Sequence, residues 1–204
     1  MRYIKKIPPT DKLFCESLLS SGWKKLKEPA NIRTAIIYSL PFAILVSVIE
    51  IFFIYFLYTP FREVIDGQRE LMFEIQININ SLWYVVLIVA FLLIHEFIHA
   101  CFIPNAVNSN KTFWGFNGMF GFVYTEEKIK KYRFLLISVM PYILLSFVFP
   151  IVLNLLGLLN SFICLLCLIN ASGSCVDLLN IVLITMQVPK DSYIVNSGFE
   201  TYFK

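Results

Sequence analysis

Four long apolar stretches dominate the chain, and each is long enough to cross a lipid bilayer. A transmembrane helix needs about 20 mostly apolar residues, because each residue adds about 1.5 Å of rise. The predicted spans cover residues 34–58, 82–103, 134–156 and 158–188. Four spans place the two flanking segments of the chain on the same side of the membrane.

The fourth stretch contains the segment NASGSCVD, whose small and polar residues interrupt an otherwise apolar run. Gly173 lies between two serines, and glycine in a helix interior costs about 1 kcal/mol relative to alanine. The segment therefore predicts a loosened or broken helix. Broken helices at membrane depth are tolerated mainly where they line a polar site or a cavity.

Lysine and arginine are distributed unevenly between the two sides of the predicted bundle. Most lie before the first span or in the loop between the second and third spans, whereas the first loop carries only Arg62 and Arg69. Because basic segments stay in the cytoplasm, both flanking segments and the second loop are predicted to be cytoplasmic. The basic N-terminal segment is expected to lie on anionic membrane lipid. No nucleic-acid-binding pattern accompanies it.

The second loop carries the pattern of a β-hairpin. Asn117-Gly118 separates two short runs of aromatic and β-branched residues, which favours a tight turn between strands. We predict strands at residues 112–116 and 119–125, with an unpaired aromatic loop as the alternative. The expected fold class is an all-α polytopic membrane protein with four transmembrane helices and a small cytoplasmic β-hairpin between the second and third.

These patterns divide the chain into a basic cytoplasmic arm at residues 1–33, a membrane domain at 34–189 and a cytoplasmic tail at 190–204. Within the arm, TDKLFCESLLSSGW predicts a short amphipathic helix with Thr10 as its N-cap. We interpret the arm as a solvated tether that touches the membrane. The predicted apolar side of its helix comprises Leu13, Phe14, Leu18 and Leu19.

The composition agrees with a membrane protein. Of the 204 residues, 58% are hydrophobic and 15% are charged, which is far from the balance of soluble domains. No cleavable signal peptide precedes the first span, so this span is expected to remain as an anchor. The five cysteines are odd in number, and a disulfide framework is not expected. Cys164 and Cys167 are interpreted as small packing residues of the fourth span.

The only two histidines lie inside the second predicted span, in LLIHEFIHACF. His95 and His99 are four residues apart, so on a helix their side chains share one face and can bind one metal ion. Glu96 is rotated by about 100° and can reach a water on that metal without being a ligand. This H-E-x-x-H pattern predicts a Zn²⁺ site. The alternative is a pair of hydrogen-bonded core histidines with a paired glutamate.

A catalytic zinc site usually has three protein ligands, so a carboxylate or a thiol must join the two histidines. The candidates are Glu50, Cys175 and Asp177. The histidines lie about 6 and 12 Å, and Asp177 about 16 Å, from the cytoplasmic ends of their spans, whereas Glu50 lies toward the outer leaflet. Glu50 is expected to pair with another polar group or to lie near the outer interface. We predict Asp177 as the third ligand, followed by Cys175.

Three features together resemble the site-2-protease-like intramembrane zinc metalloproteases: HEFIH in one span, a hairpin-like loop after it, and SGSCVD two spans later. A closer resemblance, over most of the chain, is to a family of zincin-type membrane peptidases. It implies that His95, His99 and Asp177 bind zinc and that Glu96 is the catalytic base. Site-2 proteases usually carry Leu-Asp-Gly at the third ligand, where this chain has Val-Asp-Leu.

The predicted function is zinc-dependent hydrolysis of peptide bonds in membrane-associated protein or peptide substrates. Zinc would lower the pKa of its water from about 16 toward 7, and Glu96 would pass the proton to the leaving amine. The hairpin edge could hold an unwound substrate by strand addition. A compact chain without an added extracellular domain favours a bacterial plasma membrane. The alternatives are a non-catalytic zinc-binding protein, and a transporter component with an ion path along Glu50, Glu96 and Asp177.

Overall fold

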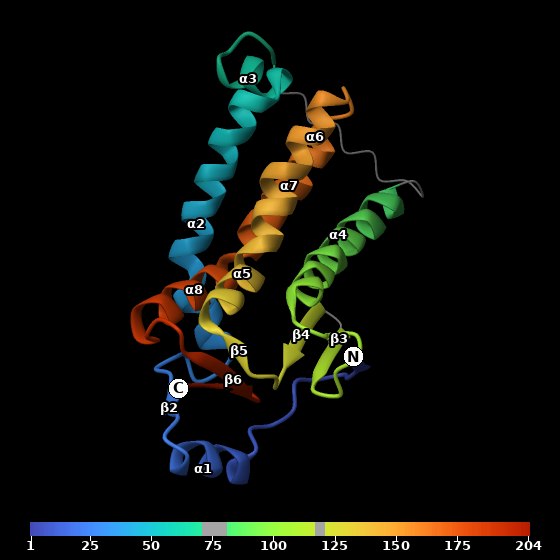
Figure 1. Ribbon diagram of the computed structural model, residues 1–204. Coiled ribbons are helices and arrows are strands. Elements are labelled where there is room, and N and C mark those ends of the chain that lie inside the picture. The colour runs from blue at the N-terminus through green and yellow to red at the C-terminus, as the bar shows by residue number, and fades with distance from the viewer. Residues whose placement is uncertain (71–80, 117–120) are drawn as a thin grey trace.

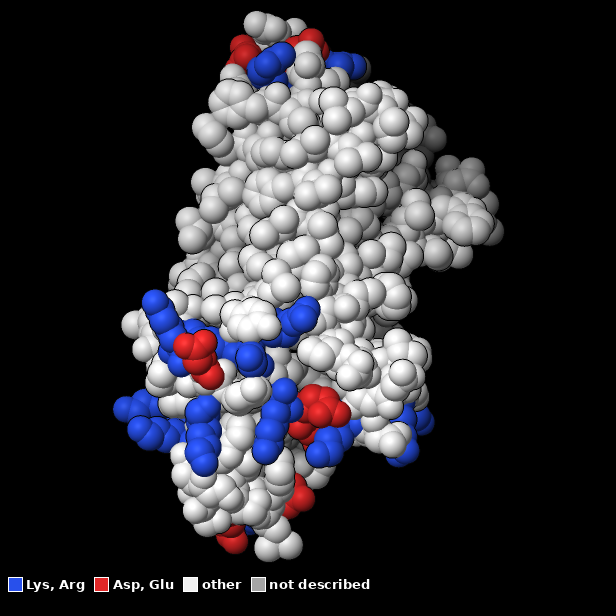
Figure 2. All heavy atoms as spheres, viewed as in Figure 1, with Lys and Arg blue, Asp and Glu red and all other residues white. Residues whose placement is uncertain are grey.

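The computed structural model describes residues 1–70, 81–116 and 121–204 and is mostly helical. Four helical segments are long and apolar enough to cross a membrane, namely Ile32–Leu57, Leu82–Phe102, Lys131–Leu155 and Ser161–Gln187. Their ends lie within three residues of the predicted limits, so the four predicted spans are confirmed. On the face shown in Figure 2, charged side chains gather at the two ends of the molecule, with an uncharged surface between them. The protein is therefore an integral membrane protein.

In the described residues the spans are built from seven helical elements, with a further short helix after the first span; Figure 1 shows their arrangement. The first span is α2 (Ile32–Leu57), which α3 (Thr59–Ile65) follows, and the second is α4 (Ser81–Phe102). The third comprises α5 (Lys131–Tyr142), the π-helix η1 (Ile143–Val148) and α6 (Phe149–Leu155), and the fourth comprises α7 (Ser161–Gly173) and α8 (Cys175–Gln187). In the packed bundle, α2 contacts α7 and α8, and α4 contacts α5.

The fourth span is interrupted at the predicted place. Helix α7 ends at Gly173 and α8 begins at Cys175, with Ser174 between them. The Ser174 hydroxyl donates to the Asn170 carbonyl oxygen at 2.9 Å, which satisfies a polar group at the end of α7. The break leaves Asp177 in the first turn of α8.

The third span contains a π-helical segment that the sequence pattern does not predict. Pro150 has no N–H to donate to the carbonyl of Ser146, four residues before it, and a proline at such a position disturbs the helical hydrogen-bond ladder. The Phe149 N–H donates to the Leu144 carbonyl, five residues back, as in a π-helix. Ser146 lies inside this segment and is fully buried.

The all-α prediction is wrong in one respect, because the protein also contains two small sheets. The first has the strand order β1-β3-β4 and is formed by β1 (Arg2–Tyr3), β3 (Thr112–Phe116) and β4 (Gly121–Thr125). Strand β3 pairs in parallel with β1 and antiparallel with β4. The predicted turn Asn117-Gly118 and the start of the second predicted strand, residues 119 and 120, lie outside the described residues.

The second sheet joins the predicted arm to the predicted tail. Its order is β2-β7-β6-β5, formed by β2 (Lys24–Lys25), β5 (Ile129–Lys130), β6 (Tyr193–Ser197) and β7 (Glu200–Phe203). Helix α1 (Lys12–Ser20) packs on this sheet, and the shared core consists of Cys15, Leu18, Trp23, Val195 and Tyr202. The arm is therefore folded against the tail, and its interpretation as a solvated tether is wrong.

The helix in the arm also differs in detail from its prediction. Its N-cap is Asp11 rather than Thr10, because Asp11 Oδ1 accepts a hydrogen bond from the Phe14 N–H at 3.1 Å. Of the predicted apolar side, Leu18 is buried but Leu13 is 79% exposed. The buried side is instead selected by contact with the second sheet.

Candidate metal centre

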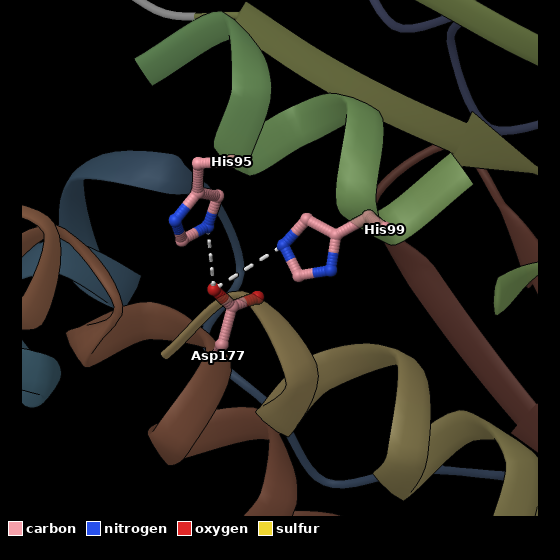
Figure 3. Close-up of side chains that lie close together, drawn as sticks. All are labelled: His95, His99 and Asp177. Carbon is pink, nitrogen blue, oxygen red and sulfur yellow. Dashed lines mark ion pairs between the residues drawn. The ribbon is translucent and has the colours of Figure 1, made fainter. Parts of the chain in front are cut away.

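Helices α4 and α8 bring His95, His99 and Asp177 together, with the three side chains pointing toward one another (Figure 3). The Nε2 atoms of His95 and His99 lie 3.4 and 3.5 Å from the same oxygen, Oδ2 of Asp177. One potential ligand atom from each residue lies within 4.8 Å of the others. Both nitrogen–oxygen distances exceed the usual 2.7–3.2 Å of an N–H···O hydrogen bond, so direct hydrogen bonding does not account for the arrangement.

Two of the three separations between the ligand atoms fit a shared zinc ion, and the two histidine nitrogens lie within 4.8 Å of each other. Zinc lies about 2.0–2.2 Å from nitrogen and oxygen ligands in tetrahedral sites, which puts two ligand atoms about 3.3–3.6 Å apart. The two measured separations, 3.4 and 3.5 Å, fall in this interval. Two imidazoles and one carboxylate also form a ligand set of the kind found in catalytic zinc sites, which leave a fourth position open.

The other nitrogen of each ring is held by a separate partner. His99 Nδ1 lies 2.8 Å from the carbonyl oxygen of Ile137, which can only accept, so this nitrogen carries the hydrogen. His95 Nδ1 lies 2.8 Å from Asn170 Oδ1, while the Asn170 amide nitrogen donates to Ser146 Oγ at 2.9 Å. With both Nδ1 atoms protonated, both Nε2 lone pairs face the Asp177 carboxylate. A cation bound between these three acceptor atoms makes their convergence favourable.

Asn170 is a site residue that the sequence reading missed. It lies on α7, is fully buried, and also donates to the carbonyl oxygen of Pro141 at 3.3 Å. It precedes Asp177 by seven residues, close to two helical turns, and it opens the polar segment NASGSCVD. That spacing is the signal that could have identified it, because outer-shell partners of zinc-binding histidines fix the ring orientation and the tautomer.

Glu96 lies on a neighbouring side of α4 and packs against β4. A Cβ atom on Gly121 would lie only 2.9 Å from Glu96 Cγ, which shows how closely the strand approaches this side chain. Glu96 also lines a cleft of about 480 Å³ together with Trp114, Gly121 and Val123. The glutamate is thus positioned by the first sheet beside the histidines and outside the group of three.

The structure separates the other two ligand candidates from this group. Cys175 Sγ lies 3.3 Å from the Ser39 hydroxyl on α2. Glu50 is fully buried on α2, and within the described residues neither of its carboxylate oxygens has a hydrogen-bond partner. The polar partner expected for Glu50 is therefore not seen there. Cys164 and Cys167 are buried and not disulfide-bonded, as expected for packing residues.

Comparison with known families gives a match over residues 86–193 to the family described as "Putative zincin peptidase". The match runs from α4 to the first residue of β6, covers more than half of the chain and includes His95, Glu96, His99 and Asp177. Comparisons with curated proteins and with solved structures find no match. The family expected from the two motifs is confirmed, and its zincin character implies a zinc cofactor. The chain therefore belongs to the family of zincin peptidases.

Proposed function

We propose that this protein is a membrane-embedded zinc metallopeptidase that hydrolyses peptide bonds of membrane-associated proteins or peptides. The observation that carries the proposal is the convergence of three ligand-type atoms, His95 Nε2, His99 Nε2 and Asp177 Oδ2. We assign these residues as the zinc ligands and Glu96 as the catalytic base. The resemblance of HEFIH and SGSCVD to site-2-protease-like enzymes supports the same assignment.

In this mechanism a zinc ion held by His95, His99 and Asp177 would act as a Lewis acid that activates water and polarises the scissile carbonyl group. Glu96 takes the proton of the attacking water and delivers it to the leaving amine. Packing against β4 holds the Glu96 side chain at the cleft, where a substrate can reach it. Asn170 and the Ile137 carbonyl keep both imidazoles in the tautomer that presents Nε2 to the metal.

The cleft beside Glu96 suits a peptide in an extended conformation. Strand β4 is one of the two outer strands of the first sheet in the described part of the chain, because β3 lies between β1 and β4. An outer strand offers backbone groups to which an extended peptide can add. The cleft is also lined by Phe97, Trp114 and Phe122, which favours apolar substrate side chains. A helical substrate would have to unwind, because its peptide bonds are shielded within the helix.

We further propose that the end of the bundle that carries the two sheets faces the cytoplasm. The lysines of β2, β5 and the second loop gather at this end, and Figure 2 shows the corresponding concentration of basic side chains below the uncharged surface. The positive-inside rule then places the metal centre within reach of cytoplasmic water. The same conclusion follows from the sequence, in which lysine and arginine are concentrated before the first span and in the second loop.

The proposal is tested by measuring zinc and peptide cleavage on the same purified samples. Metal content is determined by inductively coupled plasma mass spectrometry, and cleavage by mass spectrometry of a mixture of apolar membrane-associated peptides. Wild type should hold about one zinc per chain and cleave part of the mixture. Glu96→Gln should keep zinc and lose cleavage, while the exposed-helix control Glu63→Gln should retain both. Wild type without stoichiometric zinc contradicts the proposal, and zinc without cleavage by wild type favours the non-catalytic alternative.

A further inference from the structure

A second cleft, of about 750 Å³, lies between the segment that follows β2 and the helices α2 and α8. It shares no lining residue with the cleft beside Glu96. Its volume falls in the range of clefts that bind small molecules, about 300–1,000 Å³. The residues on which its chemistry depends are Lys25, Lys27, Glu28, Tyr38, Leu179 and Leu183.

One side of this cleft is cationic. Lys25 is paired with Glu200 at 2.5 Å, whereas within the described residues no carboxylate lies within ion-pair distance of Lys27. The carboxylate of Glu28 accepts hydrogen bonds from the N–H and the hydroxyl of Thr201 at 2.6 and 2.9 Å. Burial raises the pKa of Glu28, and its carboxylate is bonded to Thr201 rather than paired with Lys27. The unpaired ammonium of Lys27 therefore dominates this side.

The opposite side is apolar and belongs to the membrane spans. Leu179 and Leu183 are one helical turn apart on α8, and Tyr38 on α2 is 63% exposed. The cleft thus joins a cationic segment outside the spans to an apolar wall within them. A cationic side next to an apolar side is complementary to a phospholipid, whose anionic phosphate lies at the membrane surface and whose acyl chains lie within the bilayer.

The cationic side is held in place before any ligand binds. The Lys27 N–H donates to Gln187 Oε1 at 2.9 Å, and the Gln187 amide nitrogen donates to the Lys27 carbonyl at 2.9 Å. This pair of bonds fixes the Lys27 backbone to the last residue of α8. A fixed backbone lowers the ordering cost of binding, so the lysine is preorganised relative to the apolar wall.

We propose that this cleft binds one anionic phospholipid, with its phosphate at Lys27 and Lys25 and the start of an acyl chain against Tyr38, Leu179 and Leu183. A lysine ammonium binds phosphate as a compact point charge. Lys27, which has no carboxylate within ion-pair distance in the described part of the chain, favours an anionic over a zwitterionic headgroup. Because Leu179 and Leu183 lie on the helix of Asp177, the lipid would also support the helix that carries the third proposed ligand.

The test measures lipid retention and needs no peptidase activity. The full chain is reconstituted in nanodiscs of phosphatidylcholine with one fifth phosphatidylglycerol, released into mild detergent, and analysed by native mass spectrometry. Wild type should retain one phosphatidylglycerol in preference to phosphatidylcholine. Lys27→Gln should reduce this retention about fivefold, the effect of one lysine near an anionic surface, and Lys27→Arg should restore it.

Lys190→Gln is the matched control, because Lys190 is exposed in the segment after α8 and does not line the cleft. It should leave retention unchanged. Equal retention of the two lipids by wild type, or equal losses in Lys27→Gln and Lys190→Gln, would overturn the proposal. Thermal unfolding of each sample verifies that the variants are folded, independently of their zinc content. A chain that retains lipid but lacks zinc supports the lipid site while contradicting the proposed peptidase.

Discussion

Two acidic side chains within the spans, the half-buried Asp177 and the fully buried Glu50, have very different surroundings. At the metal centre, the Asp177 carboxylate faces two imidazoles at 3.4 and 3.5 Å, and each imidazole has its own outer partner. At Glu50, both carboxylate oxygens are fully buried, yet no hydrogen-bond partner is present among residues 1–70, 81–116 and 121–204. An acid in an apolar span is therefore insufficient to identify a site. A metal site is indicated where the acid faces other potential ligands that have hydrogen-bond partners of their own.

The largest effect is expected when the carboxylate is removed from the group of His95, His99 and Asp177. Asp177→Ala should reduce zinc to background and abolish cleavage, because two imidazoles alone leave the metal with too few protein ligands. Cys175→Ala is the control, since its thiol contacts Ser39 and lies outside the cluster. It should retain about one zinc per chain. Metal analysis of both purified variants makes this comparison, and zinc loss in Cys175→Ala alone would reverse the assignment of the third ligand.

The next largest effect is expected when Asn170, the hydrogen-bond partner of His95, is removed and all three proposed ligands stay in place. Asn170→Ala should weaken zinc affinity by about 10- to 100-fold, since outer partners of ligating histidines have effects of this size. It should also cost about 1–3 kcal/mol of stability, because the buried His95 Nδ1 loses its partner and Ser146 Oγ keeps only its bond to the Cys167 carbonyl. Zinc competition with a chelator and thermal unfolding measure the two quantities. Unchanged zinc affinity would show that Asn170 serves packing alone.

A smaller effect is expected where the sheet positions the proposed base. In Gly121→Ala the new methyl group would lie 2.9 Å from Glu96 Cγ, so that the glutamate must shift. We expect cleavage to fall roughly tenfold with zinc content unchanged, since general-base catalysis depends on hydrogen-bond reach. Gly173→Ala is the matched control, because no atom lies within 4 Å of a Cβ at that position. Equal activities of the two variants would argue against positioning of Glu96 by β4.

The smallest effect is expected at the unpartnered acid. Glu50→Gln keeps the shape of the side chain and removes an acidic group without a described partner, so stability should stay within about 1 kcal/mol of wild type or rise. Zinc content should not change. Thermal unfolding in detergent and metal analysis provide the readouts. A large destabilisation would mean that Glu50 is held by a charged partner, and the contrast between the two acids would disappear.

Local pattern was sufficient to predict the spans, the break before Asp177 and the zinc-binding motif. Span length follows from bilayer thickness, and the relation of His95 to His99 follows from the helical repeat. Rise per residue favours Asp177 over Glu50, because the histidines and Asp177 lie at similar distances from the cytoplasmic ends of their spans, whereas Glu50 lies toward the outer leaflet. These inferences need no knowledge of how helices pack side by side.

The remaining features depend on contacts between distant segments. Asn170 reaches His95 because α7 packs near α4, and its spacing from Asp177 marks it as a candidate without specifying which histidine it contacts. The second sheet pairs Lys25 with Tyr202, and strands of two to five residues are too short for an alternating pattern to be recognised. The same contacts decide which side of α1 is buried. These three features therefore depend on tertiary packing and cannot be predicted from the local sequence pattern.

The second sheet also constrains the order in which the protein can mature. Strand β2 precedes all four spans and its partner β7 follows them, so their pairing must wait until the last span has been synthesised and inserted. Until then, Trp23 and Tyr202, which share one core, remain apart. The early segment thus stays without its final partner until β7 has been synthesised, and closure of this sheet follows insertion of the spans.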